Sequence, residues 1–152
     1  MPVMQIKDAM ARNPLSVRVD ATIQEAAAGM RDAGVGALPV VSDSEELVGI
    51  VTDRDIALRA VAEGLGSETT VDQVMTKQLI VVDASDEFED ALSLMRERQV
   101  RRLPVVDGER LVGMVAQADI AALIESGAAA DTLRELSEPA ATQAARRAQE
   151  RR

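Results

Sequence analysis

Residues 49–56, GIVTDRDI, carry the polar side chains best suited to hold a small ligand. Thr52 follows an apolar run, so we expect it where a strand turns into a helix, beside backbone N–H groups that are free to face an anion. Asp55 only accepts hydrogen bonds, which suits a vicinal diol, and we expect it to be partly exposed at the helix start. With Asp53 and Arg54 between them, these side chains predict a site for a phosphorylated or diol-bearing ligand.

The same residues fit a structural role that needs no ligand. A threonine at a helix N-cap and an acid three positions later form a capping pair, in which each side chain accepts a hydrogen bond from the other residue's backbone N–H. Thr52 and Asp55 have this spacing. The motif is therefore compatible with a cap, a ligand site or both.

A second copy of the segment, residues 113–120 (GMVAQADI), keeps the acid as Asp119 but has Ala116 in place of the threonine. The missing hydroxyl removes one hydrogen bond to a ligand, worth about 0.5 to 1.5 kcal/mol. From the sequence we expect the site at Asp119 to be weaker than the site at Asp55, or empty.

The composition argues against an enzyme. The chain of 152 residues has no histidine and no cysteine, which removes the usual general base near neutral pH and the usual zinc ligands. One acidic run could suggest a metal site but is better explained by helix-start and solubility charges. Its members are Asp83, Asp86, Glu87, Glu89 and Asp90. We expect neither catalytic residues nor a bound metal.

The charge and hydropathy pattern argues against two classes of partner. With a formal net charge of −9 the chain repels the polyanionic backbone of nucleic acids, and its single aromatic residue offers no platform for stacked bases. No apolar run approaches the length of a membrane span, and the N-terminal residues lack the pattern of a signal peptide. We predict a soluble cytoplasmic protein that binds neither nucleic acid nor membrane.

The elements that must position these side chains occur twice. Val35–Val41 (VGALPVV) recurs at an offset of 65 residues as VRRLPVV, and Leu47–Ala57 recurs at an offset of 64 residues. Each copy has a short apolar run, an amphipathic helix pattern, two apolar runs around a polar turn, and a second helix pattern. In the first copy these patterns cover about residues 15–19, 22–33, 38–41, 47–51 and 52–64. A β-α-β-β-α unit is predicted twice.

One such unit leaves a sheet face uncovered. We therefore expect an α/β (α+β) fold in which two repeats pack sheet to sheet with pseudo-twofold symmetry. The polar stretch GLGSETT at residues 64–70 suits a linker. The predicted organisation is a first repeat at residues 1–65, a second at 66–127, and a helical or disordered tail at 128–152 that ends in QAARRAQERR.

The repeat, with its Leu-Pro-Val-Val strand and its GIVTDRDI segment, resembles the CBS domain (the cystathionine β-synthase repeat). The likeness covers about residues 6–127, and a tandem pair of this kind is called a Bateman module. In that family the threonine contacts phosphate or ribose and the aspartate accepts from the ribose diol. The resemblance implies that Thr52 and Asp55, and more weakly Asp119, bind an adenosine-containing ligand in the cleft between the repeats. AMP, ADP and ATP are expected before NAD and S-adenosylmethionine.

The resemblance also implies a role for Arg101 and Arg102, which replace a Gly-Ala pair of the first copy. Basic residues at this position reach ligand phosphates in the family, which would complete a composite site with Thr52 and Asp55. The alternative is a solvated pair bonded to acids such as Asp107. The adenine is expected among aliphatic side chains, namely Val17, Ala37, Leu38 and Pro39.

These expectations describe a regulatory module that is not an enzyme and whose ligand occupancy changes the binding of an unknown protein partner in trans. The chain resembles a stand-alone pair with no effector domain attached. The alternative function is a ligand-free dimeric interaction protein that kept the fold. We further predict a homodimer formed through the amphipathic helices, with Ala27, Met30, Leu92 and Met95 as contributors.

Overall fold

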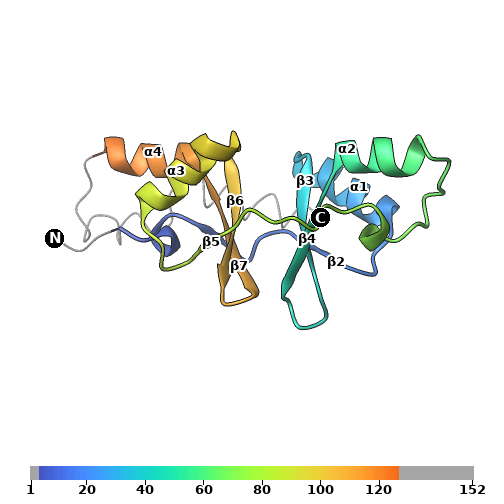
Figure 1. Ribbon diagram of the computed structural model, residues 1–152, viewed down its shortest axis with the longest axis horizontal. Coiled ribbons are helices and arrows are strands. Elements are labelled where there is room, and N and C mark those ends of the chain that lie inside the picture. Colours follow the sequence, from blue (N-terminus) through green and yellow to red (C-terminus); the bar gives the residue numbers. More distant parts are fainter. Residues whose placement is uncertain (1–3, 127–152) are drawn as a thin grey trace. The chain divides into compact units, whose positions relative to one another are not determined.

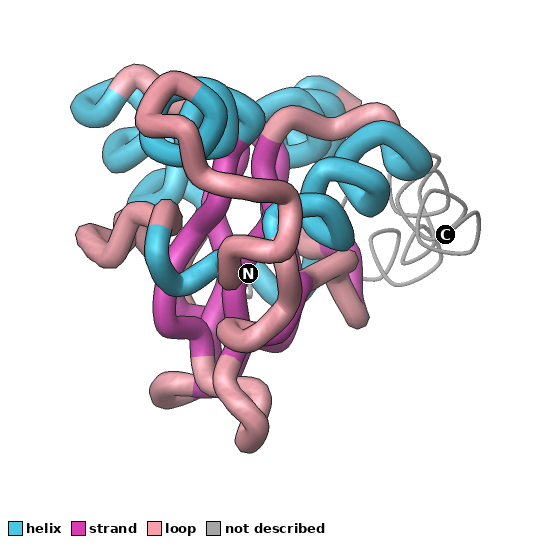
Figure 2. Tube along the Cα trace, turned by 90° about the vertical axis from the view of Figure 1, so that its right-hand side faces the viewer, coloured by secondary structure: helices cyan, strands magenta, loops and turns pink. Residues whose placement is uncertain are grey.

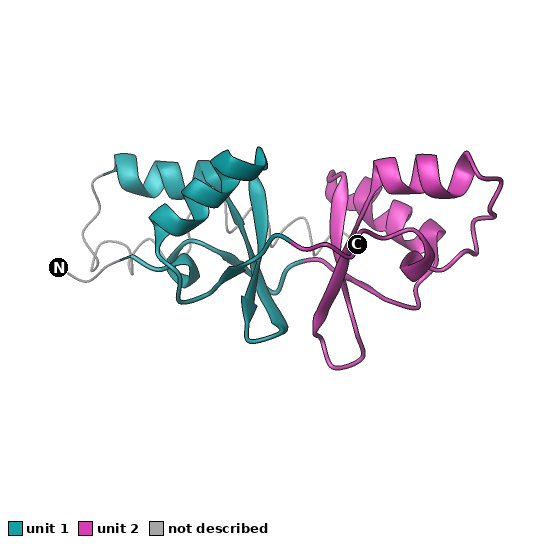
Figure 3. Ribbon diagram, in the orientation of Figure 1, with its two compact units in different colours: residues 1–14, 80–147 teal, residues 15–79, 148–152 magenta. Residues whose placement is uncertain are grey.

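The computed structural model describes residues 4–126, which form two compact units (Figure 3). Unit 1 contains residues 4–14 and 80–126, and unit 2 contains residues 15–79. The predicted tail at residues 128–152 lies outside the described residues, and so does its basic end. Each unit has its own sheet and its own hydrophobic core.

Unit 2 has a three-stranded sheet in the order β2-β3-β4, in which β2 is parallel and β4 antiparallel to the central strand. A turn at residues 42–46 joins β3 and β4 into a hairpin. The last helical segment begins as α-helix and continues as a π-helix. The elements of unit 2 are β2 (Val17–Arg18), α1 (Ile23–Ala33), β3 (Ala37–Val41), β4 (Leu47–Thr52), α2 (Asp53–Asp55), η2 (Ile56–Val61) and the 3-10 helix η3 (Val71–Gln73).

Unit 1 repeats this arrangement and adds a strand, giving a four-stranded sheet in the order β1-β7-β6-β5. The hairpin of β6 and β7 closes with Gly108 in the left-handed region, at φ 66°. The elements of unit 1 are the 3-10 helix η1 (Ile6–Asp8), β1 (Ala11–Arg12), β5 (Val82–Asp83), α3 (Phe88–Arg98), β6 (Arg102–Asp107), β7 (Arg110–Ala116) and α4 (Gln117–Glu125).

The sequence pattern explains why these elements form and pack. In α1, Ile23, Ala26 and Met30 recur on one helix face and are buried against β3. The predicted capping box at its start is confirmed, because Glu25 N–H donates to Thr22 Oγ1 over 3.1 Å and Thr22 N–H donates to Glu25 Oε2 over 3.3 Å. In unit 1, α3 packs in the same way against β6 and α4 (Figure 1). The predicted α+β fold class is confirmed.

Each unit is completed by a segment that belongs, in the sequence, to the other repeat. Ala11 of β1 pairs with Met114 of β7, and Thr76 exchanges backbone hydrogen bonds of 2.8 and 3.0 Å with Ile50 of β4. The compact units therefore differ from the sequence repeats, whose boundaries at residues 1–65 and 66–127 stay a prediction.

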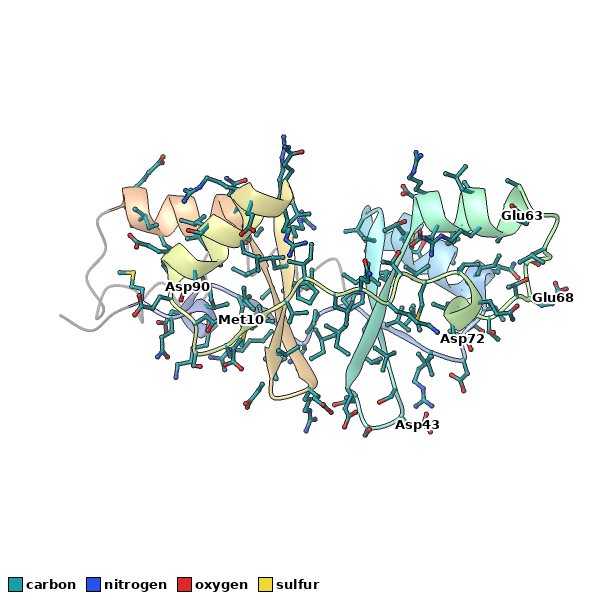
Figure 4. The ribbon with its side chains drawn as sticks, viewed as in Figure 1. Met10, Asp43, Glu63, Glu68, Asp72 and Asp90 are labelled. Carbon is teal, nitrogen blue, oxygen red and sulfur yellow. The ribbon has the colours of Figure 1, made fainter. Side chains whose placement is uncertain are left out.

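These crossing segments explain one glycine of each motif. A Cβ atom on Gly49 would lie 3.0 Å from the carbonyl oxygen of Thr76, and a Cβ atom on Gly113 would lie 2.9 Å from that of Ala11. The same atom on Gly113 would lie 2.6 Å from Sδ of Met10, which Figure 4 labels. Glycine is required at both positions because a backbone passes directly over the strand.

Among residues 4–126 the helices are too short or too polar to cross a bilayer.

Candidate functional site

Both candidate motifs lie at the same place in their units, where the second strand of the hairpin becomes a helix. In unit 2 this junction is Thr52–Asp53, and in unit 1 it is Ala116–Gln117. Figures 1 and 2 show the junctions at the end of each hairpin away from its turn. The side chains singled out by the sequence are thus brought to one end of each unit.

Thr52 and Asp55 form the capping pair that their spacing predicts. Asp55 N–H donates to Thr52 Oγ1 over 3.0 Å, and Thr52 N–H donates to Asp55 Oδ2 over 3.1 Å. Thr52 has an extended backbone, at φ −117° and ψ 162°, as an N-cap residue requires. The capping interpretation of these two residues is confirmed, and their ligand role stays a prediction.

Asp55 has further partners within unit 2. Thr76 Oγ1 donates to Asp55 Oδ2 over 3.5 Å, and Arg59 Nε lies 3.7 Å from Asp55 Oδ1. The residue is only 8% exposed. The expectation that Asp55 is partly exposed is therefore wrong, because the crossing segment that contains Thr76 covers it.

Asp119 occupies the equivalent position in unit 1 in a different state. Ala116 has no hydroxyl, so the start of α4 has no side-chain cap. Asp119 is partly buried, and within residues 4–126 its carboxylate has no hydrogen bond or close ion pair. Desolvation raises the pKa of Asp119 above its ordinary value, and the charge of Arg102 offsets part of this rise. Asp119 is a carboxylate that has lost part of its hydration without gaining a hydrogen-bond donor.

Arg101 and Arg102 lie at the same end of unit 1 as Asp119. Gln117 N–H donates to the carbonyl oxygen of Arg101 over 2.8 Å, and Arg102 pairs with Ala116 across the hairpin. Both arginine side chains are exposed. The alternative in which they bond to Asp107 is wrong, because Asp107 is at the other end of β6, about 16 Å away at the rise of a β-strand.

The other predicted site residues divide by exposure. Asp53 and Arg54 are exposed in the first turn after Thr52, where Arg54 N–H donates to Asp53 Oδ1 over 2.8 Å. Ala37 is exposed and pairs with Thr52 across the β3–β4 ladder. The remaining three are buried, and two of them, Val17 and Leu38, belong to the core of unit 2; the set is Val17, Leu38 and Pro39. Of the predicted adenine contacts, only Ala37 is exposed beside the junction.

The acidic run serves the turn before α3. Asp86 Oδ2 accepts from Asp83 N–H over 2.9 Å, and Asp90 Oδ2 accepts from Glu87 N–H over 3.2 Å. Ser85 donates to Asp83 from its backbone and its hydroxyl, which lowers the pKa of Asp83. No group of three metal-ligating side chains occurs within the described part of the chain.

Two residues of the unit 2 site, Arg59 and Thr76, were missed by the sequence reasoning. Arg59 also donates from Nη1 to the carbonyl oxygens of Val74 and Met75, each over 3.3 Å. An available signal was the crossing segment itself, since residues 75–76 align with residues 10–11 in the repeat. The offset shows which residues are equivalent but not that they cross to the neighbouring unit.

Comparison with known proteins places both junctions in one family. A family model described as CBS domain matches the chain twice, over residues 6–61 and 71–126. The chain is 46% identical over 116 residues to the CBS domain-containing protein YhcV of Bacillus subtilis (strain 168). That alignment covers 76% of this chain and 82% of the relative.

Two similar solved structures contain adenosine compounds. CBSX2 in complex with AMP has a TM-score of 0.69 and 27% identity, covering 82% of this chain and 98% of CBSX2. The CBS domain pair of protein MJ0100, in complex with 5′-methylthioadenosine and S-adenosyl-L-methionine, has a TM-score of 0.68 and 29% identity. It covers 84% of this chain and all of that domain pair.

Proposed function

The chain belongs to the CBS domain family, and on that basis we propose that it is a regulatory module that binds an adenosine-containing nucleotide. The ligands of the two similar structures, AMP and the S-adenosylmethionine pair, share an adenosine group with a ribose diol. A diol needs hydrogen-bond acceptors, and a phosphate needs cations. AMP, ADP or ATP are the ligands we favour.

The observation that carries this proposal is the pairing of chemistries at the hairpin end of unit 1. Asp119 offers a carboxylate with no hydrogen-bond donor of its own in residues 4–126, and Arg101 and Arg102 offer two exposed guanidinium groups from the neighbouring strand. These are the acceptor and the cations that a ribose phosphate needs. Thr52 and Asp55 of unit 2 are the second candidate position.

Regulation requires that the ligand bind two conformations of the protein with different affinities. A nucleotide bound at a strand-to-helix junction contacts the first turn of the helix, and its occupancy can therefore bias how that helix meets a protein partner. We propose that the partner is a separate protein, regulated in trans.

Thermal scanning with a panel of nucleotides tests the proposal. We expect AMP, ADP or ATP to raise the unfolding midpoint, with NAD and S-adenosylmethionine as further adenosine compounds. GMP and GTP are the matched controls, since they keep the ribose and phosphate and change the base. Equal shifts with guanine and adenine nucleotides would point to phosphate binding alone.

The arginine pair has its own test. Because only a phosphate offers charge to a guanidinium, Arg101→Ala and Arg102→Ala should weaken AMP binding roughly tenfold while changing adenosine binding much less. Arg31→Ala is the control, since Arg31 is an exposed arginine of unit 2 that pairs with Asp32. Equal losses for AMP and adenosine would remove both arginines from the site.

The alternative is a dimeric interaction protein that binds no nucleotide. One observation favours it: the carboxylate of Asp55 already has partners in the protein, so unit 2 is stable without a ligand. If no adenosine compound shifts the midpoint of the wild-type chain, this second function replaces the first.

A further inference from the structure

The two units provide an internal comparison at one position, because Asp55 and Asp119 are equivalent residues of the repeat. Three polar residues contact Asp55, namely Thr52, Arg59 and Thr76. At the repeat offsets of 64 and 65 residues, their counterparts around Asp119 are Ala116, Leu123 and Ala11. All three partners of the carboxylate have been replaced by apolar residues in unit 1.

In unit 2 the carboxylate is committed to the protein. Oδ2 accepts from Thr52 N–H and from the hydroxyl of Thr76, and Oδ1 faces the guanidinium of Arg59. A ribose diol could use Asp55 only by displacing these donors, and a buried donor that loses its acceptor costs about 1 to 3 kcal/mol. At 8% exposure the residue also presents little surface to a ligand.

The partners of Asp55 hold the chain where it leaves unit 2. Thr76 follows η3 by three residues, and Arg59 donates to the carbonyl oxygens of Val74 and Met75. Residues 74–76 lead directly to Ile80, where unit 1 resumes. Asp55 therefore fastens the α2 helix start to the segment that connects the two units.

In unit 1 the same position is free of such bonds. Leu123 is buried in the hydrophobic core at 6% exposure, and Ala11 contacts β7 through its backbone. The crossing segment is thus held by strand pairing and apolar packing, which leaves the carboxylate of Asp119 available. Arg102, on the adjacent strand, lies close enough for its charge to act on Asp119.

We propose that the two repeats have divided two roles: Asp119 is the ligand-accepting carboxylate, and Asp55 is a structural latch on the connecting segment. This inference rests on the proposed nucleotide function and specifies the half of the chain that performs it. It reverses the order expected from the sequence, in which the intact threonine and aspartate marked the first repeat as the stronger site. One ligand per chain follows, bound at the junction of β7 and α4.

Calorimetric titration of the whole chain with AMP tests the inference, with S-adenosylmethionine as a second probe. We expect one AMP per chain. Asp119→Asn should weaken AMP binding roughly 10- to 100-fold, since it removes the charge from an acceptor of the diol. Asp55→Asn is the matched control at the equivalent position, and it should leave the affinity within about twofold.

The latch has a readout that needs no ligand. Asp55→Asn should lower the ligand-free unfolding midpoint by roughly 2 to 6 °C, because it weakens the cap and the bonds to Thr76 and Arg59. Thr76→Ala removes one of these bonds and keeps the carboxylate, so it should give a smaller loss with unchanged affinity if Asp55→Asn does not fold. Asp119→Asn should not lower the midpoint.

The outcomes separate the two proposals. Absence of binding to the wild-type chain overturns the nucleotide function and this inference with it. Binding of two AMP molecules per chain overturns the division of roles alone. The same holds if Asp55→Asn or Thr76→Ala weakens AMP binding as strongly as Asp119→Asn.

Discussion

A carboxylate at the start of a helix can stabilise the helix or accept a ligand, and its hydrogen bonds decide between the two roles. Asp55 has donors from Thr52 and Thr76, whereas Asp119 has lost the equivalent donors and is partly buried. The sequence revealed the cap, because Thr52 and Asp55 are three residues apart. It did not reveal the burial, because Thr76 is 21 residues from Asp55 in the sequence.

Because the pKa of Asp119 is raised in the folded chain, its ionisation opposes folding. This cost is absent below the unfolded pKa of about 3.8 and grows as the pH rises through the folded pKa. We therefore expect Asp119→Asn to stabilise the ligand-free chain at pH 7, by less than about 1 kcal/mol, since the side chain still contacts water. Urea unfolding of both chains at several pH values measures the difference.

That difference should shrink as the pH falls toward 4 and the wild-type carboxyl becomes protonated. Asp83→Asn is the control with the opposite sign, because the pKa of Asp83 is lowered by Ser85 and its ionisation favours folding. If Asp119→Asn destabilises the chain at pH 7, Asp119 has a stabilising partner that this account does not include.

At the scale of the elements, the local patterns were informative and the non-local contacts were not. The hairpins, the amphipathic helices and the Thr22–Glu25 cap follow from periodicity and spacing, and the structure has them within a few residues of the predicted positions. The two-residue strand β1 was missed because its partner, β7, is about 100 residues further along the chain. The π-helical turn at Ile56–Val61 was missed because no pattern distinguishes it from an α-helix.

The crossing segments predict the effect of one methyl group. Gly113→Ala would place a Cβ atom 2.9 Å from the carbonyl oxygen of Ala11, and a backbone atom cannot give way as a side chain can. We expect this variant to lose about 1 to 3 kcal/mol of unfolding free energy. Chemical denaturation measures the loss.

Gly29→Ala is the matched control for this variant. Gly29 is a buried glycine within α1, where the nearest atom to an added Cβ is 3.4 Å away, an ordinary contact. Alanine in a helix interior should be neutral or stabilising by up to about 1 kcal/mol. Equal effects of the two substitutions would mean that the crossing segment does not press on Gly113.

At the scale of the whole molecule, the predicted dimer needs different contact residues. Met30 and Met95 are 5% and 1% exposed and lie in the cores of their own units, so their proposed place in an interface is wrong. The exposed large apolar side chains of the described region are Leu58, Val61, Leu65 and Ile124. Three of these follow α2 at helical spacing, and amphipathic periodicity alone could not separate a core face from an exposed one.

We expect a homodimer whose interface includes Leu58 and Val61. Val61→Glu should then convert the dimer to a monomer in light scattering at micromolar concentration, since a buried unpaired carboxylate is costly. Val61 is 68% exposed, so the fold of the single chain should tolerate the substitution. Ala27→Glu, on the exposed part of α1, should leave the dimer intact. A wild-type monomer, or a dimer broken only by Ala27→Glu, contradicts this interface.

The central claim is that the native chain binds an adenosine nucleotide, and the most direct test is the unfolding midpoint as a function of AMP concentration. A ligand that binds only the folded state stabilises it by about 2.7 kcal/mol at 100 times its dissociation constant. For a chain of this length the midpoint should rise by roughly 5 to 10 °C, starting near the dissociation constant and continuing with the logarithm of the AMP concentration. A midpoint that stays constant up to millimolar AMP, ADP and ATP contradicts the account.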